Sequence, residues 1–245
     1  MKHKLLIAGV VLVVAALVVY FGADFFLGSV VARGVNRFGP RITQTKVTLA
    51  GAHISPLSGS GTLTGLFVGN PRGWASEKAF YFGKVHIEVA PGSLFGDHIV
   101  VNEVLIDKPE FVYETRVVSS NIGDLLQNIR GTARGSQAEQ AATKSGKPIK
   151  FEIHHFHVTN GRVTLGVGPA AVTFPMPPVE LTDVGKSEGG FTSGELAVAI
   201  MHSLSGSVVQ ASTQAAGKIG STLGAAAGHG LKDLFGGKQE GNSGK

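Results

Sequence analysis

The feature that most constrains this chain is an apolar run near its N-terminus, from Leu5 to Ala23, that contains no charged residue. The run has 19 residues, of which 17 are apolar and two are glycine. As an α-helix it would extend about 28 Å, close to the hydrocarbon thickness of a bilayer, which is about 30 Å. The sequence therefore predicts a transmembrane helix, with residues 1–30 forming a membrane anchor.

A cleaved secretory signal peptide is the alternative interpretation of this run. The apolar region of a signal peptide has about 7–15 residues and ends at a cleavage site flanked by small side chains. The run in this chain is longer, and the bulky side chains of Phe21 and Leu27 occupy the −3 positions of two candidate cleavage sites. We therefore favour an uncleaved anchor.

The charges that flank the run leave the orientation of the anchor open. Lys2 and Lys4 precede the run, which favours a cytoplasmic N-terminus. Four basic residues follow it and favour the opposite orientation, namely Arg33, Arg37, Arg41 and Lys46. The positive-inside rule alone does not choose between the two topologies.

Residues 42–184 are predicted to be mainly β-strands. The signal is clearest in residues 84–89, where Val85, Ile87 and Val89 alternate with charged or imidazole side chains. Turn sequences rich in Gly, Ser, Asn and Pro separate the strand-like runs. The expected fold class is mainly β with α, built on a curved antiparallel sheet, and residues 31–190 are expected to form this β domain.

A weak internal repeat has an offset of 52 residues. Residues 101–113 are one copy and residues 153–165 are the other, and each reads as a strand, a turn and an alternating strand. In both copies the apolar phase slips by one residue near the start, which predicts a β-bulge. Repeated bulged hairpins suit an elongated, curved sheet.

Two segments show helical periodicity. Residues 121–129 place four apolar side chains on one face, and Asn121 can cap this short helix. Residues 192–195 match a capping box, and an apolar stripe follows from Leu196 to Ala226, which predicts a helix to about Phe235 within a C-terminal segment of residues 191–235. Residues 131–148 are predicted to be a mobile loop and residues 236–245 a disordered tail.

Composition and motifs argue against several function classes. The chain has no cysteine, which excludes thiolate chemistry, and no nucleophile–base–orienter pattern occurs, so no enzyme activity and no cofactor are predicted. His155 and His157 would share one face of a strand beside His154, but a third metal ligand is not placed, so a polar strand face is preferred to a metal site. The basic residues are dispersed, so nucleic acid is not an expected partner.

Several short motifs occur in a fixed order over about two-thirds of the chain. They are VTL at 47–49, SGSGTL at 58–63, LFVGNPxG at 66–73, GKVxIxV at 83–89, IVVxEVxIDxPE at 99–110, FxVxNGxV at 156–163 and LTDVG at 181–185. Taken in this order, they resemble the AsmA-like proteins of bacterial envelopes. No single motif carries specific chemistry, and the order is what carries the resemblance.

The resemblance implies a single-pass anchor in the bacterial inner membrane, with the N-terminus in the cytoplasm and the main domain in the periplasm. It also implies a taco-like sheet with an apolar concave face, related to chorein-type lipid-transfer proteins, and phospholipid as the candidate ligand. Bridging two membranes would require envelope protein partners or self-association. The candidate lipid-binding residues on this face are Val85, Ile87, Val89, Ile99, Val101, Phe111, Tyr113, Phe151 and Ile153.

Two functions therefore remain open. The chain could bind or handle lipid in envelope and outer-membrane biogenesis, or it could be a structural or assembly protein of the envelope that binds no lipid. The apolar stripe of the C-terminal helix needs a partner, because an isolated helix exposing it would be marginally stable. The candidate partners are the sheet, a second copy of the chain and a membrane surface, and we expect the sheet, with the helix acting as a lid.

Overall fold

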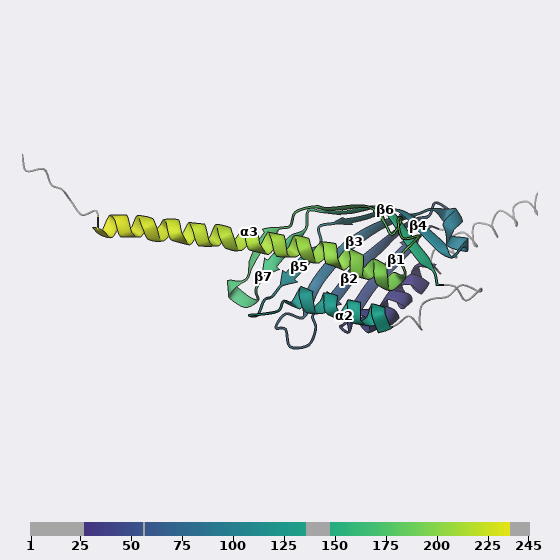
Figure 1. Cartoon of the computed structure of the whole chain (residues 1–245), viewed down its shortest axis with the longest axis horizontal. Coiled ribbons are helices and arrows are strands. Elements are labelled where there is room, and N and C mark those ends of the chain that lie inside the picture. The colour runs from purple at the N-terminus through teal and green to yellow at the C-terminus, as the bar shows by residue number, and fades with distance from the viewer. Residues whose placement is uncertain (1–26, 56, 136–147, 236–245) are drawn as a thin grey trace, which may run out of the picture.

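The computed structural model describes residues 27–55, 57–135 and 148–235, and these contain nine β-strands in one sheet and three α-helices (Figure 1). The predicted class, mainly β with α, is confirmed. The predicted span from Leu5 to Ala23 and the predicted tail at residues 236–245 lie outside the described residues. Within the part of the chain that is described, no helix combines the length and the apolar character that crossing a membrane requires.

The elements follow one another from a first helix, over residues 27–43, to a long C-terminal helix. The strands are β1 (Val47–Ile54), β2 (Ser60–Gly69), β3 (Lys78–Val89), β4 (His98–Asp107), β5 (Glu110–Tyr113), β6 (Lys150–Thr159), β7 (Arg162–Leu165), β8 (Val172–Pro175) and β9 (Val179–Val184). The other helices are α2 (Asn121–Gly135) and α3 (Ser193–Phe235), with 3₁₀ turns η1 (Pro91–Phe95) and η3 (Gly168–Ala170).

The sheet is mixed, and the expectation of a purely antiparallel sheet is wrong. Strands β1, β2 and β3 form an antiparallel meander, and the far edge of β3 pairs with β4 along one half and with β5 along the other. Strand β6 then runs parallel to β4, and β7 runs parallel to β5. A parallel neighbour needs a crossover, which the segment containing α2 supplies between β5 and β6.

The 52-residue offset of the sequence repeat equals the offset between paired residues in these parallel strands. Val101 lies opposite Ile153, Asp107 opposite Thr159 and Tyr113 opposite Leu165, and each pair is separated by 52 residues. The two copies are therefore neighbouring strands that run in the same direction. The predicted hairpin within each copy is wrong, because the chain bends between β4 and β5, and between β6 and β7, without reversing.

The predicted phase slip is confirmed in both copies. Val101 and Val104 are both buried, as are Ile153 and Phe156, although three positions separate the members of each pair. In the first copy the pairing of β3 with β4 shifts register between Glu88 and Val89. The bulge lets each strand keep apolar side chains on the same face of the sheet along its whole length.

The helices α2 and α3 pack on this apolar face, where they close the core (Figure 1). The short helix predicted from Asn121 is confirmed, but α2 continues to Gly135, so residues 131–135 are helical and not part of a loop. The rest of that predicted loop, residues 136–147, lies outside the described residues. Helix α3 begins at Ser193 and is continuous to Phe235, and its far end extends beyond the sheet (Figure 1).

The first helix protects the edge of the sheet at β1. The Asn36 side chain accepts a hydrogen bond from the Leu49 backbone N–H at 2.6 Å and donates one to the Leu49 carbonyl at 3.2 Å. These two bonds occupy the backbone groups of Leu49 that a neighbouring strand would otherwise bond. They therefore hinder the pairing of β1 with a strand of a second chain. Sequence periodicity did not reveal this helix.

Candidate functional site

The nine candidate lipid-binding residues come from four strands of the sheet and divide into two groups by burial. Five are buried in the core, namely Val85, Val101, Phe111, Tyr113 and Ile153. The other four are half-buried, namely Ile87, Val89, Ile99 and Phe151. The sheet register pairs half-buried Val89 with buried Val101, and it pairs the half-buried residues Ile99 and Phe151 with each other.

Helix α3 packs on the apolar face over the strands β5 to β9. Leu204 is 2% exposed and Val208 is fully buried, and both belong to the same core cluster as Phe156 and Val158 of β6. Further along α3, the buried positions are the small residues Ala211, Ser212 and Ala215. The expectation that the C-terminal helix packs on the sheet is confirmed.

The half-buried candidate residues share one end of the sheet. Ile87 and Val89 lie where β3 ends, and Ile99 and Phe151 lie where β4 and β6 begin. The described part of the first helix lies close to the same end, because a Cβ atom added to Gly28 would collide with the Ala52 carbonyl oxygen near the end of β1. The four half-buried candidates therefore lie at the end of the sheet beside Gly28.

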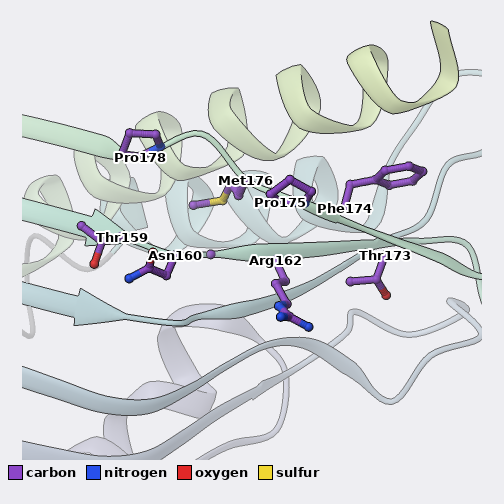
Figure 2. A pocket seen from close by; sticks show the side chains of 9 residues that line it. Thr159, Asn160, Arg162, Thr173, Phe174, Pro175, Met176 and Pro178 are labelled. Atoms are coloured by element: carbon purple, nitrogen blue, oxygen red, sulfur yellow. The ribbon is translucent and has the colours of Figure 1, made fainter. Parts of the chain in front are cut away.

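A surface groove of about 710 Å³ lies elsewhere, beside the breaks between β6 and β7 and between β8 and β9 (Figure 2). Its lining is mixed, since Asn160 and Arg162 face it together with Phe174 and Met176. None of the nine candidate residues lines this groove. A smaller groove of about 370 Å³, between the end of β5 and α2, includes Tyr113 alone of the nine.

The opposite face of the sheet is polar and rich in histidine. His155 and His157 point the same way, as expected, and their rings stack with centroids 6.0 Å apart. His154 also faces outward, since Ile153 and Phe156 on either side of the pair His154 and His155 are buried. His154 approaches Glu152 and Asp183, a grouping that the sequence did not predict, because it depends on the register between β6 and β9.

A buried polar cluster at the start of α2 was also missed. Glu114 is 8% exposed, and its carboxylate accepts hydrogen bonds from the backbone N–H groups of Ala75 and Ser76 at 3.0 and 2.8 Å. Asn121, which is fully buried, donates to the Val112 carbonyl and to the Asn70 side chain and accepts from the Glu114 N–H. These hydrogen bonds join the β2–β3 loop and the end of β5 to α2, so we assign the cluster a structural role.

These features define a class by architecture: a mainly β protein with α-helices, in which the helices cover one face of a mixed sheet and the other face is polar. Comparison with protein-family models and comparison with curated proteins both gave no match.

Proposed function

We propose that the chain is a membrane-anchored, non-enzymatic protein of the AsmA-like type that binds phospholipid on the concave apolar face of its curved sheet during envelope biogenesis. In this proposal the run from Leu5 to Ala23 holds the chain in the bacterial inner membrane, with the N-terminus in the cytoplasm. The domain from about residue 30 onward then stands in the periplasm, and α3 is the movable lid of the apolar face.

The observation that carries this proposal is the half-buried apolar end of the sheet. Ile87, Val89, Ile99 and Phe151 gather at the end of the sheet beside Gly28 of the first helix, and in the proposal this helix follows the membrane anchor. A lipid leaving the bilayer would meet this end of the sheet first. Each CH₂ group that moves from water into such a site contributes about 0.8 kcal/mol, so an acyl chain placed against these half-buried side chains would be stabilised by each CH₂ group that it buries.

Native mass spectrometry of the detergent-extracted chain tests the proposal. The wild-type chain is expected to carry phospholipid, and Ile87→Asp is expected to carry none, because a carboxylate at this position would be desolvated by an acyl chain. His86→Asp is the matched control, since it places the same charge on the neighbouring residue, whose side chain points to the polar face. The control is expected to keep its lipid.

Two results would contradict the proposal. One is a folded Ile87→Asp chain that still carries phospholipid, and the other is a wild-type chain that carries none after extraction in mild detergent. Thermal unfolding of each variant shows whether it is folded, and Ile99→Asp provides a second substitution at the same end of the sheet.

A structural role in the envelope is the second candidate function. The observation that favours it is that the chain's own side chains fill the apolar face. Val158 of β6 and Val208 of α3 are both fully buried in the same core cluster. In that case α3 is a permanent part of the core and the chain binds no lipid. The absence of lipid from the wild-type chain would favour this role.

A further inference from the structure

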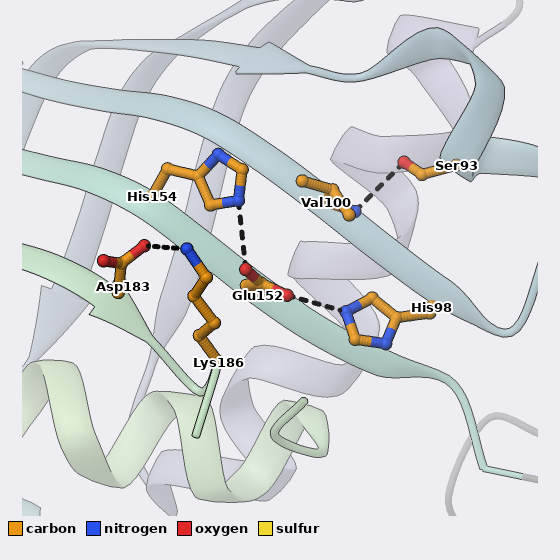
Figure 3. A network of polar contacts seen from close by, with 7 residues as sticks. All are labelled: Ser93, His98, Val100, Glu152, His154, Asp183 and Lys186. Atoms are coloured by element: carbon orange, nitrogen blue, oxygen red, sulfur yellow. Dashed lines mark hydrogen bonds and ion pairs between the residues drawn. The ribbon is translucent and has the colours of Figure 1, made fainter. Parts of the chain in front are cut away.

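Three side chains with metal-binding chemistry meet on the polar face of the sheet. Glu152 and His154 lie two residues apart on β6 and point outward on either side of the buried Ile153. Asp183 projects from the edge strand β9, between the residues that pair with Ile153 and His155. One carboxylate oxygen from each acid and one imidazole nitrogen lie within 4.8 Å of one another (Figure 3).

The Glu152 carboxylate is held in place between two imidazoles. Its Oε1 is 3.0 Å from Nε2 of His154, and its Oε2 is 3.1 Å from Nε2 of His98 (Figure 3). The Glu152 side chain is only 12% exposed, so it has little freedom to turn away. Residues that hold a metal-binding carboxylate or imidazole in this way raise metal affinity, commonly by about 10–100-fold.

We propose that Glu152, His154 and Asp183 form a site for one divalent metal ion, with Zn²⁺ as the best match, and that His98 orients Glu152 within it. Zinc accepts imidazole nitrogen and carboxylate oxygen at about 2.0–2.2 Å, so ligand atoms that share one tetrahedral ion lie roughly 3.4 Å apart. The three ligand atoms now lie within 4.8 Å of one another, so metal binding requires side-chain rotations that bring them closer. A water molecule completes the tetrahedron on the exposed side.

The state of Asp183 supports this assignment. Its backbone is in the left-handed region, with φ of 52°, which is uncommon for a residue other than glycine and often marks a functional position.

Lys186 is the group that competes with the metal. Its ammonium Nζ lies 3.0 Å from Oδ1 of Asp183 (Figure 3). Bound metal would displace this ammonium and tie the edge strand β9 to β6. The loop that follows β9 leads directly into α3, so the metal would also fix the base of the helix that covers the apolar face.

Zinc titration of the full-length chain tests the site. The chain is purified without a histidine tag, stripped with a chelator and titrated with ZnCl₂ by calorimetry, and Co²⁺ absorption reports tetrahedral coordination. Wild type is expected to bind one equivalent saturably. Asp183→Asn tolerates the left-handed backbone and removes one ligand charge, and Glu152→Gln keeps the side-chain shape; each is expected to lower the affinity more than tenfold.

Two further variants separate a metal site from a plain ion-pair network. Lys186→Met removes the competing ammonium and is expected to raise zinc affinity, whereas a purely structural network predicts no gain. The double variant His155→Gln/His157→Gln removes the stacked imidazole pair on the same face and is expected to leave the affinity unchanged. The proposal is overturned if wild type shows no saturable one-equivalent binding, if Asp183→Asn binds as tightly as wild type, or if the double variant abolishes binding.

Discussion

Lys108 and Asn160 occupy equivalent positions directly after the neighbouring strands β4 and β6, and both have a left-handed backbone, with φ of 53° and 55°. The Lys108 N–H donates to the Thr159 carbonyl at 2.9 Å, and the Asn160 side-chain amide donates to Asp107 Oδ1 at 2.7 Å. The breaks between β4 and β5 and between β6 and β7 are therefore bonded to each other. The two long strands bend together, which keeps their parallel register on both sides of the break.

This coupling predicts that Asn160→Ala is destabilising although Asn160 is exposed. Alanine in the left-handed region costs about 1 kcal/mol, and the lost hydrogen bond to Asp107 costs about 1 kcal/mol more. We expect the free energy of unfolding, measured by urea denaturation of the purified chain, to fall by about 2 kcal/mol. Asn160→Gly avoids the backbone strain and is expected to lose roughly half as much. Equal losses for the two variants would show that backbone conformation is not the cause.

A second prediction concerns the buried amide of Asn121. Its three hydrogen bonds join β5, the β2–β3 loop and α2, and each contributes about 1 kcal/mol. We therefore expect Asn121→Ala to lower the free energy of unfolding by about 3 kcal/mol. Asn128→Ala on the same helix is the control, since Asn128 makes one hydrogen bond, to the Thr43 carbonyl, and should cost about 1 kcal/mol. Similar losses at both positions would contradict the role assigned to the cluster.

A third prediction tests the packing of α3 on the sheet. Leu204 is 2% exposed and Val209 is 43% exposed on the same helix. We expect Leu204→Ala to cost about 2–5 kcal/mol and to speed amide hydrogen exchange along α3, because it leaves a cavity against the sheet. Val209→Ala is expected to cost about 0.5 kcal/mol or less. Unchanged exchange in Leu204→Ala would mean that α3 is not held by this contact.

The sequence predicted the elements of this fold better than their pairing. The phase slip at Val101 and Ile153 and the helix from Asn121 follow from side-chain periodicity, which depends on one segment at a time. The parallel direction of β4 and β6 depends on the connection between them, and the 52-residue repeat is equally compatible with two stacked hairpins. Only the observed register shows that the two copies are neighbours.

The polar contacts across strands were not predictable for the same reason. Asp183 is separated from Glu152 by 31 residues, and nothing in its local sequence indicates that β9 places it beside His154. Asn36 is a comparable case, because its bonds to Leu49 depend on a helix that docks against the edge of the sheet. The placement of the nine apolar candidates was easier to predict, since alternation along each strand assigns most of them to one face.

The proposed topology makes a fourth prediction. A periplasmic reporter such as alkaline phosphatase, fused after Lys245, is expected to be active, and a reporter that functions only in the cytoplasm is expected to be inactive. The fusion should stay in the membrane fraction at its full length, since the proposed anchor is not cleaved. Activity of the cytoplasmic reporter alone would contradict the proposed topology.

A fifth prediction concerns the capping box at the start of α3, which is present as the sequence predicted. The Glu195 carboxylate accepts hydrogen bonds from the Thr192 N–H at 2.8 Å and the Thr192 hydroxyl at 2.9 Å. Removing the cap in Thr192→Ala is expected to cost about 1 kcal/mol in denaturation experiments at neutral pH. Thr192→Ser keeps the hydroxyl and serves as the control, with a loss of less than about 0.5 kcal/mol.

The same cap makes part of the stability depend on pH. The hydrogen bonds from the Thr192 backbone and hydroxyl lower the pKa of Glu195 below its ordinary value of 4.5. A carboxyl whose pKa is lower in the folded state stabilises the fold above its unfolded pKa, and this contribution disappears as the pH falls through the folded pKa. The stability difference between wild type and Glu195→Gln should therefore be constant near neutral pH and shrink below pH 4.5. A difference that stays constant down to acid unfolding would show that the Glu195 charge does not contribute to the cap.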